Sequence, residues 1–304
     1  MIGLSTSWRS SQANNGKELM DELITTGVEA IELEYRITHD MLREIIPIIK
    51  KRAMPVLSVH NFCPVPDSVP RSLASADVFL LSSVDKEERK QAIRYSIKTI
   101  QLAHDLETKA VVFHVGHVDM DPRKERLFEL FDRGEIGTSE GRRFVEGQLA
   151  LRKRVRQKNL DSVLFGLDRL SKVAEKLDVY IGVENRYHFH QIPDFEEIGI
   201  ILREFEGSHI GYWHDVGHAN VQERFGILNH GELLSSYSSK LLGMHIHDHI
   251  GYDDHYAPGT GEFDFDLIKK YLNSDVMKIM EIHPKVNRED LLEGLKFLKS
   301  QRIE

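Results

Sequence analysis

The sequence predicts a single-domain (β/α)₈ barrel of the TIM type spanning residues 1–304. Short apolar runs alternate with longer amphipathic stretches along the chain, and eight such pairs can be recognised. The short runs are continuously apolar, as in Val111-Val112-Phe113, which is typical of parallel strands that are covered on both faces. A chain of 304 residues with 41% hydrophobic residues can bury a core of the size that this fold requires.

Each strand and helix is predicted from its own pattern. The strands are the apolar runs Ile2–Ser7, Ala30–Glu34, Pro55–His60, Ala110–Val115, Val179–Glu184, Ile210–His214, Leu242–His247 and Val276–Ile282. The helices are the amphipathic stretches Lys17–Thr26, Thr38–Arg52, Lys86–Leu106, Phe144–Leu177, Phe195–Phe205, Glu232–Ser239, Phe265–Leu272 and Glu289–Ser300, of which the fourth is long enough to be two helices. A doubly wound open sheet is the alternative, but the first strand–helix turn lacks the G-x-G-x-x-G pattern of dinucleotide-binding folds.

The longest connection lies between the fourth and fifth strands, around Asp119–Glu140. Long insertions at the strand ends of a barrel commonly form lids or subunit contacts. The connection is therefore a candidate lid or a candidate contact between the subunits of a homo-oligomer. A surface loop without a function is the alternative.

The composition of the chain argues against a nucleic-acid-coating protein and against a membrane-spanning protein. The chain has 40 Lys and Arg against 48 Asp and Glu, and this negative balance argues against a nucleic-acid-coating protein. The basic run Arg152–Lys158 falls within a predicted helix, where we expect a solvated face or a subunit contact. No apolar run approaches the roughly 18 residues of a membrane span. Cys63 is the only cysteine and no signal-peptide pattern opens the chain, so we expect a reducing, cytoplasmic setting.

The 16 histidines of the chain gather with carboxylates at the ends of the predicted strands. The third to eighth strands end, in order, in segments that carry His60, His114, Glu184, Asp215, the pair His245 and His247, and Glu281. In a TIM barrel these carboxyl ends form the active-site face. Six consecutive strands thus deliver a His, Asp or Glu to one rim.

Packing so many carboxylates and imidazoles together without a cation would be costly. A divalent metal ion would neutralise the carboxylates and accept neutral imidazoles as ligands. Mixed carboxylate and imidazole donors suit Mn²⁺ or Zn²⁺ best, with Co²⁺, Fe²⁺ or Mg²⁺ as alternatives. The sequence therefore predicts a divalent metal site at the rim.

The strand ends resemble those of the xylose isomerase-like TIM-barrel superfamily, which holds sugar isomerases and epimerases and the related endonuclease IV class. The similar motifs are Val-Glu-Asn at Glu184, His-Asp-Val-Gly-His at Asp215, Met-His-Ile-His-Asp at His245 and Met-Glu-Ile-His-Pro at Glu281. The resemblance implies that these four residues hold one metal ion. It also implies that His218 contacts the substrate.

For the chemistry, the resemblance implies a metal-dependent isomerase or epimerase for a sugar or sugar phosphate. Proton transfer would pass through a metal-bound enediolate, with Glu184 and Glu281 as the acid/base pair. Arg186 could anchor a hydroxyl, carboxylate or phosphate group of the substrate. A salt bridge at the rim is the alternative for this arginine.

The nuclease class uses more metal ligands, and its positions also have counterparts here. They are His60, His114, His218, Asp253 and His255, the last two within Asp253–Gly261, which is similar to a D-x-H-x-x-x-G-x-G loop. The neighbouring residues match the nucleases poorly, because E-N-T-A-G is Glu-Asn-Arg-Tyr-His here and D-T-C-H is Asp-Val-Gly-His. We therefore favour the carbohydrate interpretation, in which these residues and His247 line the pocket or bind a further ion.

Two alternatives to the isomerase remain. One is a multi-zinc phosphodiesterase that acts on abasic DNA. The other is a non-catalytic barrel that binds metal or sugar, although such a protein would not need both Glu184 and Glu281.

Overall fold

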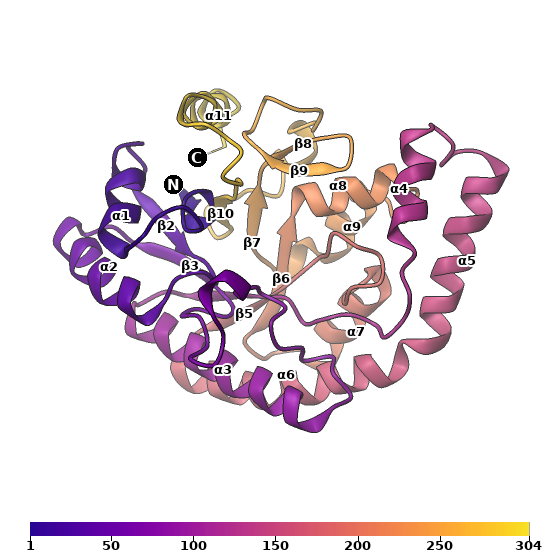
Figure 1. The fold of residues 1–304 in the computed structure, drawn as a ribbon, viewed down its shortest axis with the longest axis horizontal. Coiled ribbons are helices and arrows are strands. Elements are labelled where there is room, and N and C mark those ends of the chain that lie inside the picture. Colours follow the sequence, from indigo (N-terminus) through magenta and orange to yellow (C-terminus); the bar gives the residue numbers. More distant parts are fainter. Residues whose placement is uncertain (304) are drawn as a thin grey trace.

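Each of the eight predicted strands forms, and together they close into a parallel barrel (Figure 1). The computed structural model describes residues 1–303. The barrel strands are β1 (Ile2–Ser5), β2 (Ala30–Leu33), β3 (Val56–His60), β4 (Ala110–Phe113), β5 (Tyr180–Glu184), β6 (Ile210–Asp215), β7 (Leu241–Ile246) and β10 (Met277–Met280). Pairing of β1 with β10 closes the barrel, so the first and last strands of the chain lie side by side. The predicted (β/α)₈ barrel is confirmed.

The helices surround the barrel. They are α1 (Gly16–Ile24), α2 (His39–Arg52), α3 (Lys86–Asp105), α4 (Lys124–Asp132), α5 (Ser139–Val155), α6 (Gln157–Leu177), α7 (Phe195–Glu204), α8 (Val216–Arg224), α9 (His230–Tyr237), α10 (Asp266–Lys269) and α11 (Arg288–Ser300). Short 3₁₀ turns occupy Thr6–Trp8, Arg71–Leu73 and Ser238–Lys240. Within residues 1–303, no helix combines the length and the apolar character needed to cross a membrane.

Trp213 of β6 is fully buried inside the barrel, beneath the strand ends that form the rim. Its indole ring occupies the space that side chains at two glycine positions would otherwise fill. A Cβ atom at Gly243 would lie 2.3 Å from the indole, and one at Gly182 would lie 3.0 Å from it. The indole also contacts the ring of His245 edge to face, with centroids 5.2 Å apart. Trp213 therefore forms an apolar floor beneath the polar strand ends.

The connection between β4 and β5 contains α4 and α5 before it reaches α6, and Figure 1 shows α4 and α5 at the end of the molecule opposite α1 and α2. Phe128 of α4 stacks on Tyr252, with centroids 4.7 Å apart. Phe131 meets Phe225, at the end of α8, edge to face at 5.4 Å. Tyr252 lies in the turn between two short antiparallel strands, β8 (Asp248–Ile250) and β9 (Asp253–Tyr256). The connection thus forms a wall beside the strand ends, on an aromatic cluster of its own.

The basic run Arg152–Lys158 is not simply a solvated face, so that prediction is wrong for part of it. Arg152 is buried and donates two hydrogen bonds to the carboxylate of Glu197, at 3.0 and 2.6 Å. Arg152 also bonds Asp194, the residue that caps α7. Arg156 is buried as well and pairs with Asp194 at 3.2 Å. The two arginines face inward because they lie four residues apart, about one helical turn.

The buried pair Arg152–Glu197 gives a stability prediction. Changing Arg152 to Met should lower the free energy of unfolding by about 3–5 kcal/mol, because the buried carboxylate of Glu197 loses its nearest partner and keeps only Arg156 at 3.7 Å. Urea denaturation followed by circular dichroism measures the change. Lys153→Met is the matched control, since this neighbour is 71% exposed, and it should unfold like the unchanged protein. Equal losses in both variants would contradict the assignment.

A second prediction concerns pH. Burial lowers the pKa of His230, which lies 2.9 Å from the ring nitrogen of His214, to about 3. Between pH 6.5 and about 3 the unfolded chain binds a proton at this site and the folded chain does not. Stability should therefore fall with falling pH across that window, by up to about 1.4 kcal/mol per pH unit for this one residue. Urea midpoints at pH 7, 6, 5 and 4 should show a shallower decline for His230→Phe, but not for the exposed His39→Phe.

Candidate functional site

Four side chains from four strand ends meet at the centre of the rim. Glu184 ends β5, Asp215 ends β6, His245 lies near the end of β7, and Glu281 directly follows β10. Each offers one ligand-type atom, and these atoms all lie within 4.8 Å of one another. The Nδ1 atom of His245 is 2.6 Å from Glu184 Oε1 and 2.9 Å from Glu281 Oε2. The structure thus brings together the four predicted metal ligands, here called the central cluster, in a buried position.

Local structure explains the placement of Asp215 and His218. Asp215 caps the N-terminus of α8, where its carboxylate accepts a hydrogen bond of 2.7 Å from the backbone N–H of His218. The positive end of a helix stabilises a carboxylate at this point. Asn185 ties β5 to β6, since its amide accepts from the backbone N–H of Asp215 at 2.8 Å and donates to the Asp215 carbonyl at 2.9 Å. Capping therefore fixes a candidate ligand and a candidate substrate contact together.

The central cluster needs a positive charge. Burial alone would raise the pKa of Glu184, but the imidazoles of His245 and His114 lower it well below its usual value. Burial would likewise lower the pKa of His245, but Glu281, Glu32 and Glu184 raise it well above its usual value. Carboxylates that hold this imidazole in its charged form would equally stabilise a bound cation.

Three further groups of ligand-type side chains adjoin the central cluster, and one of them, Asp215, His247 and His255, joins it to the hairpin. The other two flank it. On one side, His60 and His114 face the second oxygen of Glu184, with Nε2 distances of 4.0 and 2.8 Å. We call these three residues the β3–β4 cluster. On the other side, the ligand-type atoms of His218, Asp254 and His255 gather into what we call the hairpin cluster.

The hairpin cluster contains Asp254 in place of the predicted residue Asp253. The D-x-H pattern pointed to Asp253, but its carboxylate pairs with Lys285 at 2.7 Å and is 57% exposed. Asp254 faces the site instead, with Oδ1 2.8 Å from His255 Nδ1. Side chains normally alternate along a strand, but His255 adopts a φ of 60° in the left-handed region, so it and Asp254 are both buried.

His247 connects the hairpin to the centre. Its Nε2 atom lies 3.0 Å from both carboxylate oxygens of Asp215, and its ring stacks on His255 with centroids 4.1 Å apart. Gly217 allows this approach, because a Cβ atom there would lie 2.1 Å from the His247 ring.

The loop after the hairpin, which contains the predicted G-x-G pattern, is held by Asp248. The Asp248 carboxylate accepts hydrogen bonds of 2.9 Å from the backbone N–H groups of Gly259, Gly261 and Phe263. A Cβ atom on Gly261 would lie 2.5 Å from that carboxylate, so glycine is required there. This pattern therefore shapes the loop through backbone hydrogen bonds.

Sequence reasoning missed Glu32, which is fully buried on β2. Its Oε2 atom is 3.1 Å from His245 Nε2 and accepts a 2.6 Å hydrogen bond from Ser58. A carboxylate within the apolar run Ala30–Leu33 was the available signal, because an ionised group is costly to bury without a partner.

A divalent cation fits the central cluster by the chemistry of its donors. Three carboxylates and one imidazole are ligands that Mn²⁺ and Zn²⁺ accept. Glu32 would hold the Nε2–H of His245, which leaves the lone pair of Nδ1 for the ion, an arrangement common in metal proteins.

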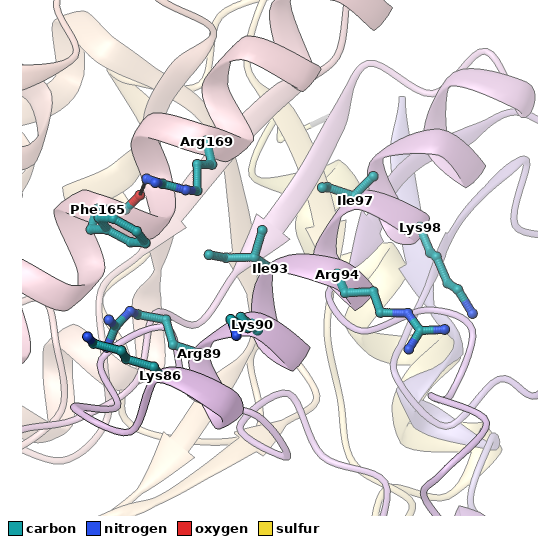
Figure 2. Close-up of a pocket in the computed structure, with 9 residues that line it drawn as sticks. All are labelled: Lys86, Arg89, Lys90, Ile93, Arg94, Ile97, Lys98, Phe165 and Arg169. Atoms are coloured by element: carbon teal, nitrogen blue, oxygen red, sulfur yellow. Dashed lines mark hydrogen bonds between the residues drawn. The ribbon is translucent and has the colours of Figure 1, made fainter.

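A separate groove of about 810 Å³ lies between α3 and α6 on the outside of the barrel (Figure 2). Basic and apolar side chains line it: Lys86, Arg89, Lys90, Ile93, Arg94, Ile97, Lys98, Phe165 and Arg169. It offers no metal ligand and contains none of the predicted site residues. The strand-end rim is therefore the candidate site.

The contact between Glu32 and His245 predicts a loss of metal affinity in Glu32→Gln. A neutral amide oxygen accepts the hydrogen bond from the Nε2–H group of His245 more weakly than a carboxylate does. Affinity for Mn²⁺ or Zn²⁺ should therefore fall by about 10–100-fold. Calorimetric titration of the metal-free protein measures this. Glu34→Gln is the control, because Glu34 is buried near the same strand end but pairs with Arg36. Unchanged affinity in the Glu32 variant would remove this role.

Comparisons with known proteins agree with the barrel. An uncharacterized protein of Methanocaldococcus jannaschii is 26% identical over 144 residues, which is 46% of this chain and about half (48%) of that relative. A D-tagatose 3-epimerase-like protein shares 18% identity and a TM-score of 0.70, covering 99% of this chain and 97% of that one. The 3-keto-D-glucoside 4-epimerase of E. coli shares 16% identity and a TM-score of 0.68, covering 98% of both chains. A family model described as a xylose isomerase-like TIM barrel matches residues 20–301. The chain belongs to the xylose isomerase-like TIM-barrel family.

Proposed function

We propose that this protein is a metal-dependent isomerase or epimerase that acts on a sugar or sugar phosphate with a carbonyl group. One observation carries the proposal. Glu184 and Glu281 are both buried, and both converge on Nδ1 of His245, at 2.6 and 2.9 Å. A pair of carboxylates at one centre can take a proton from one face of a substrate carbon and return a proton to the other.

Glu184, Asp215, His245 and Glu281 would hold the metal ion, with Mn²⁺ or Zn²⁺ as the best match to the donors. When bound, a divalent ion polarises a carbonyl group and stabilises the negative charge that develops on its oxygen.

The remaining chemistry belongs to the side chains. One glutamate removes the proton from the carbon next to the carbonyl, and the other supplies a proton to the opposite face. His218 donates from Nδ1 to the carbonyl of Asn185 at 3.0 Å, which leaves its Nε2 for a substrate oxygen. Burial lowers the pKa of His218, which keeps this imidazole neutral. Further imidazoles at the rim, those of His60, His114 and His255, can bond sugar hydroxyl groups.

The two solved structures support the choice of substrate class. By name, one resembles a D-tagatose 3-epimerase and the other is a 3-keto-D-glucoside 4-epimerase. The sugars in both names carry a keto group, which is the group that proton transfer through an enolised carbon requires. We therefore infer a ketose, an aldose or a keto-glycoside, with or without a phosphate, as the substrate.

The experiment is a screen for proton exchange in D₂O with added Mn²⁺ or Zn²⁺. Ketoses, keto-glycosides and their phosphates should be tested, and incorporation of deuterium next to the carbonyl, followed by NMR, would reveal enolisation. On a substrate found in this way, Glu184→Gln and Glu281→Gln should each lower turnover by at least ~10²–10⁴-fold, because the amide keeps an oxygen ligand but is no base.

Glu262→Gln provides a control for the same chemical change, since Glu262 is 43% exposed and pairs with Arg224. It should turn over substrate normally. Near-normal turnover in both Gln variants of the acid/base pair would contradict the mechanism and favour a binding function.

A multi-metal phosphodiesterase is the second candidate, and the flanking clusters favour it. The β3–β4 cluster shares Glu184 with the central cluster, and the hairpin cluster lies beside it. Several adjacent ions suit attack on a phosphodiester, because they can stabilise both the attacking and the leaving oxygen. Three zinc ions per chain by elemental analysis, with cleavage of a duplex that carries an abasic site, would replace the isomerase proposal. At most two ions and no cleavage would support the isomerase.

A further inference from the structure

Arg186 already places a cation at the β3–β4 cluster. Its Nη1 atom lies 2.9 Å from Oε2 of Glu184, and only 4% of the residue is exposed. The same oxygen faces Nε2 of His114 at 2.8 Å and Nε2 of His60 at 4.0 Å. The oxygen that the two histidines would share with a metal ion is therefore paired with a guanidinium group.

Apart from this arginine, the cluster is arranged to bind metal. His60 donates from Nδ1 to the carbonyl of Asn61 at 3.0 Å, and His114 donates from Nδ1 to Asp77 at 3.2 Å. Both imidazoles thus direct Nε2 toward Glu184. His114 Nε2 lies within hydrogen-bond distance of Glu184 Oε2, so a metal ion at this cluster would replace the proton of that contact.

The guanidinium is held in place from two sides. Its Nη2 atom lies 3.4 Å from Oδ2 of Asp77, so Arg186 bridges Asp77 and Glu184. A divalent ion at this cluster would sit beside a fixed positive charge, where low polarity strengthens repulsion. Moving Arg186 aside would break its buried ion pair, which is costly.

We propose that Arg186 keeps the β3–β4 cluster free of metal by supplying its positive charge. His60 and His114 are then left to hydrogen-bond substrate oxygens beside the central cluster. This inference rests on the proposed function in one respect, namely that the central cluster holds a divalent ion. It assigns the neighbouring cluster to substrate recognition, which suits an isomerase better than a multi-metal hydrolase.

The test counts ions in Arg186→Ala. Metal-free protein is saturated with Zn²⁺ or, separately, Mn²⁺, freed of loosely bound ions, and analysed by elemental mass spectrometry. The variant should bind one more ion per chain than the unchanged protein. In anomalous diffraction, the extra ion should lie between His60, His114 and Glu184. Adding His114→Ala to the variant should remove that ion again.

Arg36→Ala is the matched control, because Arg36 also pairs with a buried glutamate two residues before it, Glu34, at 3.0 Å. It should bind the same number of ions as the unchanged protein. Arg186→Gln, which is neutral but longer, replaces the alanine variant if that variant does not fold by circular dichroism.

Two results would overturn the inference: an ion within the β3–β4 cluster of the unchanged protein, or a folded Arg186 variant that gains no ion. Both are independent of the exchange screen in D₂O. A protein that enolises no sugar but gains the ion in Arg186→Ala would lose the proposed function and keep this inference. A protein that enolises a sugar but gains no ion would do the opposite.

Discussion

The burial of four carboxylates around one imidazole is the constraint on which this site depends. Glu184, Glu281 and Glu32 lie within 3.1 Å of a ring nitrogen of His245, and Asp215 lies 3.8 Å from Nδ1. So much negative charge in a water-poor setting is stable only with a compensating cation. A proton on His245 can supply one positive charge, and a divalent ion bound at Nδ1 would supply two. Metal binding and the protonation of His245 are therefore competing solutions to the same electrostatic problem.

The rest of the barrel is arranged to keep these charges in position. Trp213 fills the space below His245, and two glycines leave room for its indole. Asp215 is oriented by the helix that it caps. The hairpin and its loop are held by Asp248 through backbone hydrogen bonds. Apolar packing below and hydrogen bonding above thus limit the rearrangements by which the carboxylates could move apart.

The two flanking clusters differ in the source of their positive charge. At the β3–β4 cluster, Arg186 is already paired with Glu184. Burial and Arg186 would lower the pKa of His114 in the same cluster, but Asp77 and Glu184 raise it above its usual value. At the hairpin cluster, burial would lower the pKa of His255, but Asp254 and Glu281 raise it well above its usual value. A proton is easily displaced by a metal ion, whereas an arginine is not, since its guanidinium group stays charged at all ordinary pH values. On the proposal made above, the side chains that supply charge would thus set the number of ions that the protein binds.

The amino-acid sequence by itself determined the barrel and the central cluster. Continuous apolar runs separated by amphipathic stretches allow few other folds, and parallel strands in a barrel must bring their carboxyl ends to one rim. A residue at the end of a strand, such as Glu184 or Asp215, could therefore be placed from its position in the chain. Its motif then supplied a role by resemblance.

Only the tertiary structure decided the contacts that depend on side-chain direction or on distant segments. Glu32 meets His245 across the barrel, 213 positions away in sequence, and Asp254 rather than Asp253 faces the site because of one left-handed residue. The sequence places Arg152 on a solvated basic face, whereas in the structure it pairs with Glu197 on another helix. Local patterns predicted the eight strands and most of the helices, but not α4 or α8. The partner of a buried charge depends on how distant segments pack together, and the pattern of a single segment does not contain that information.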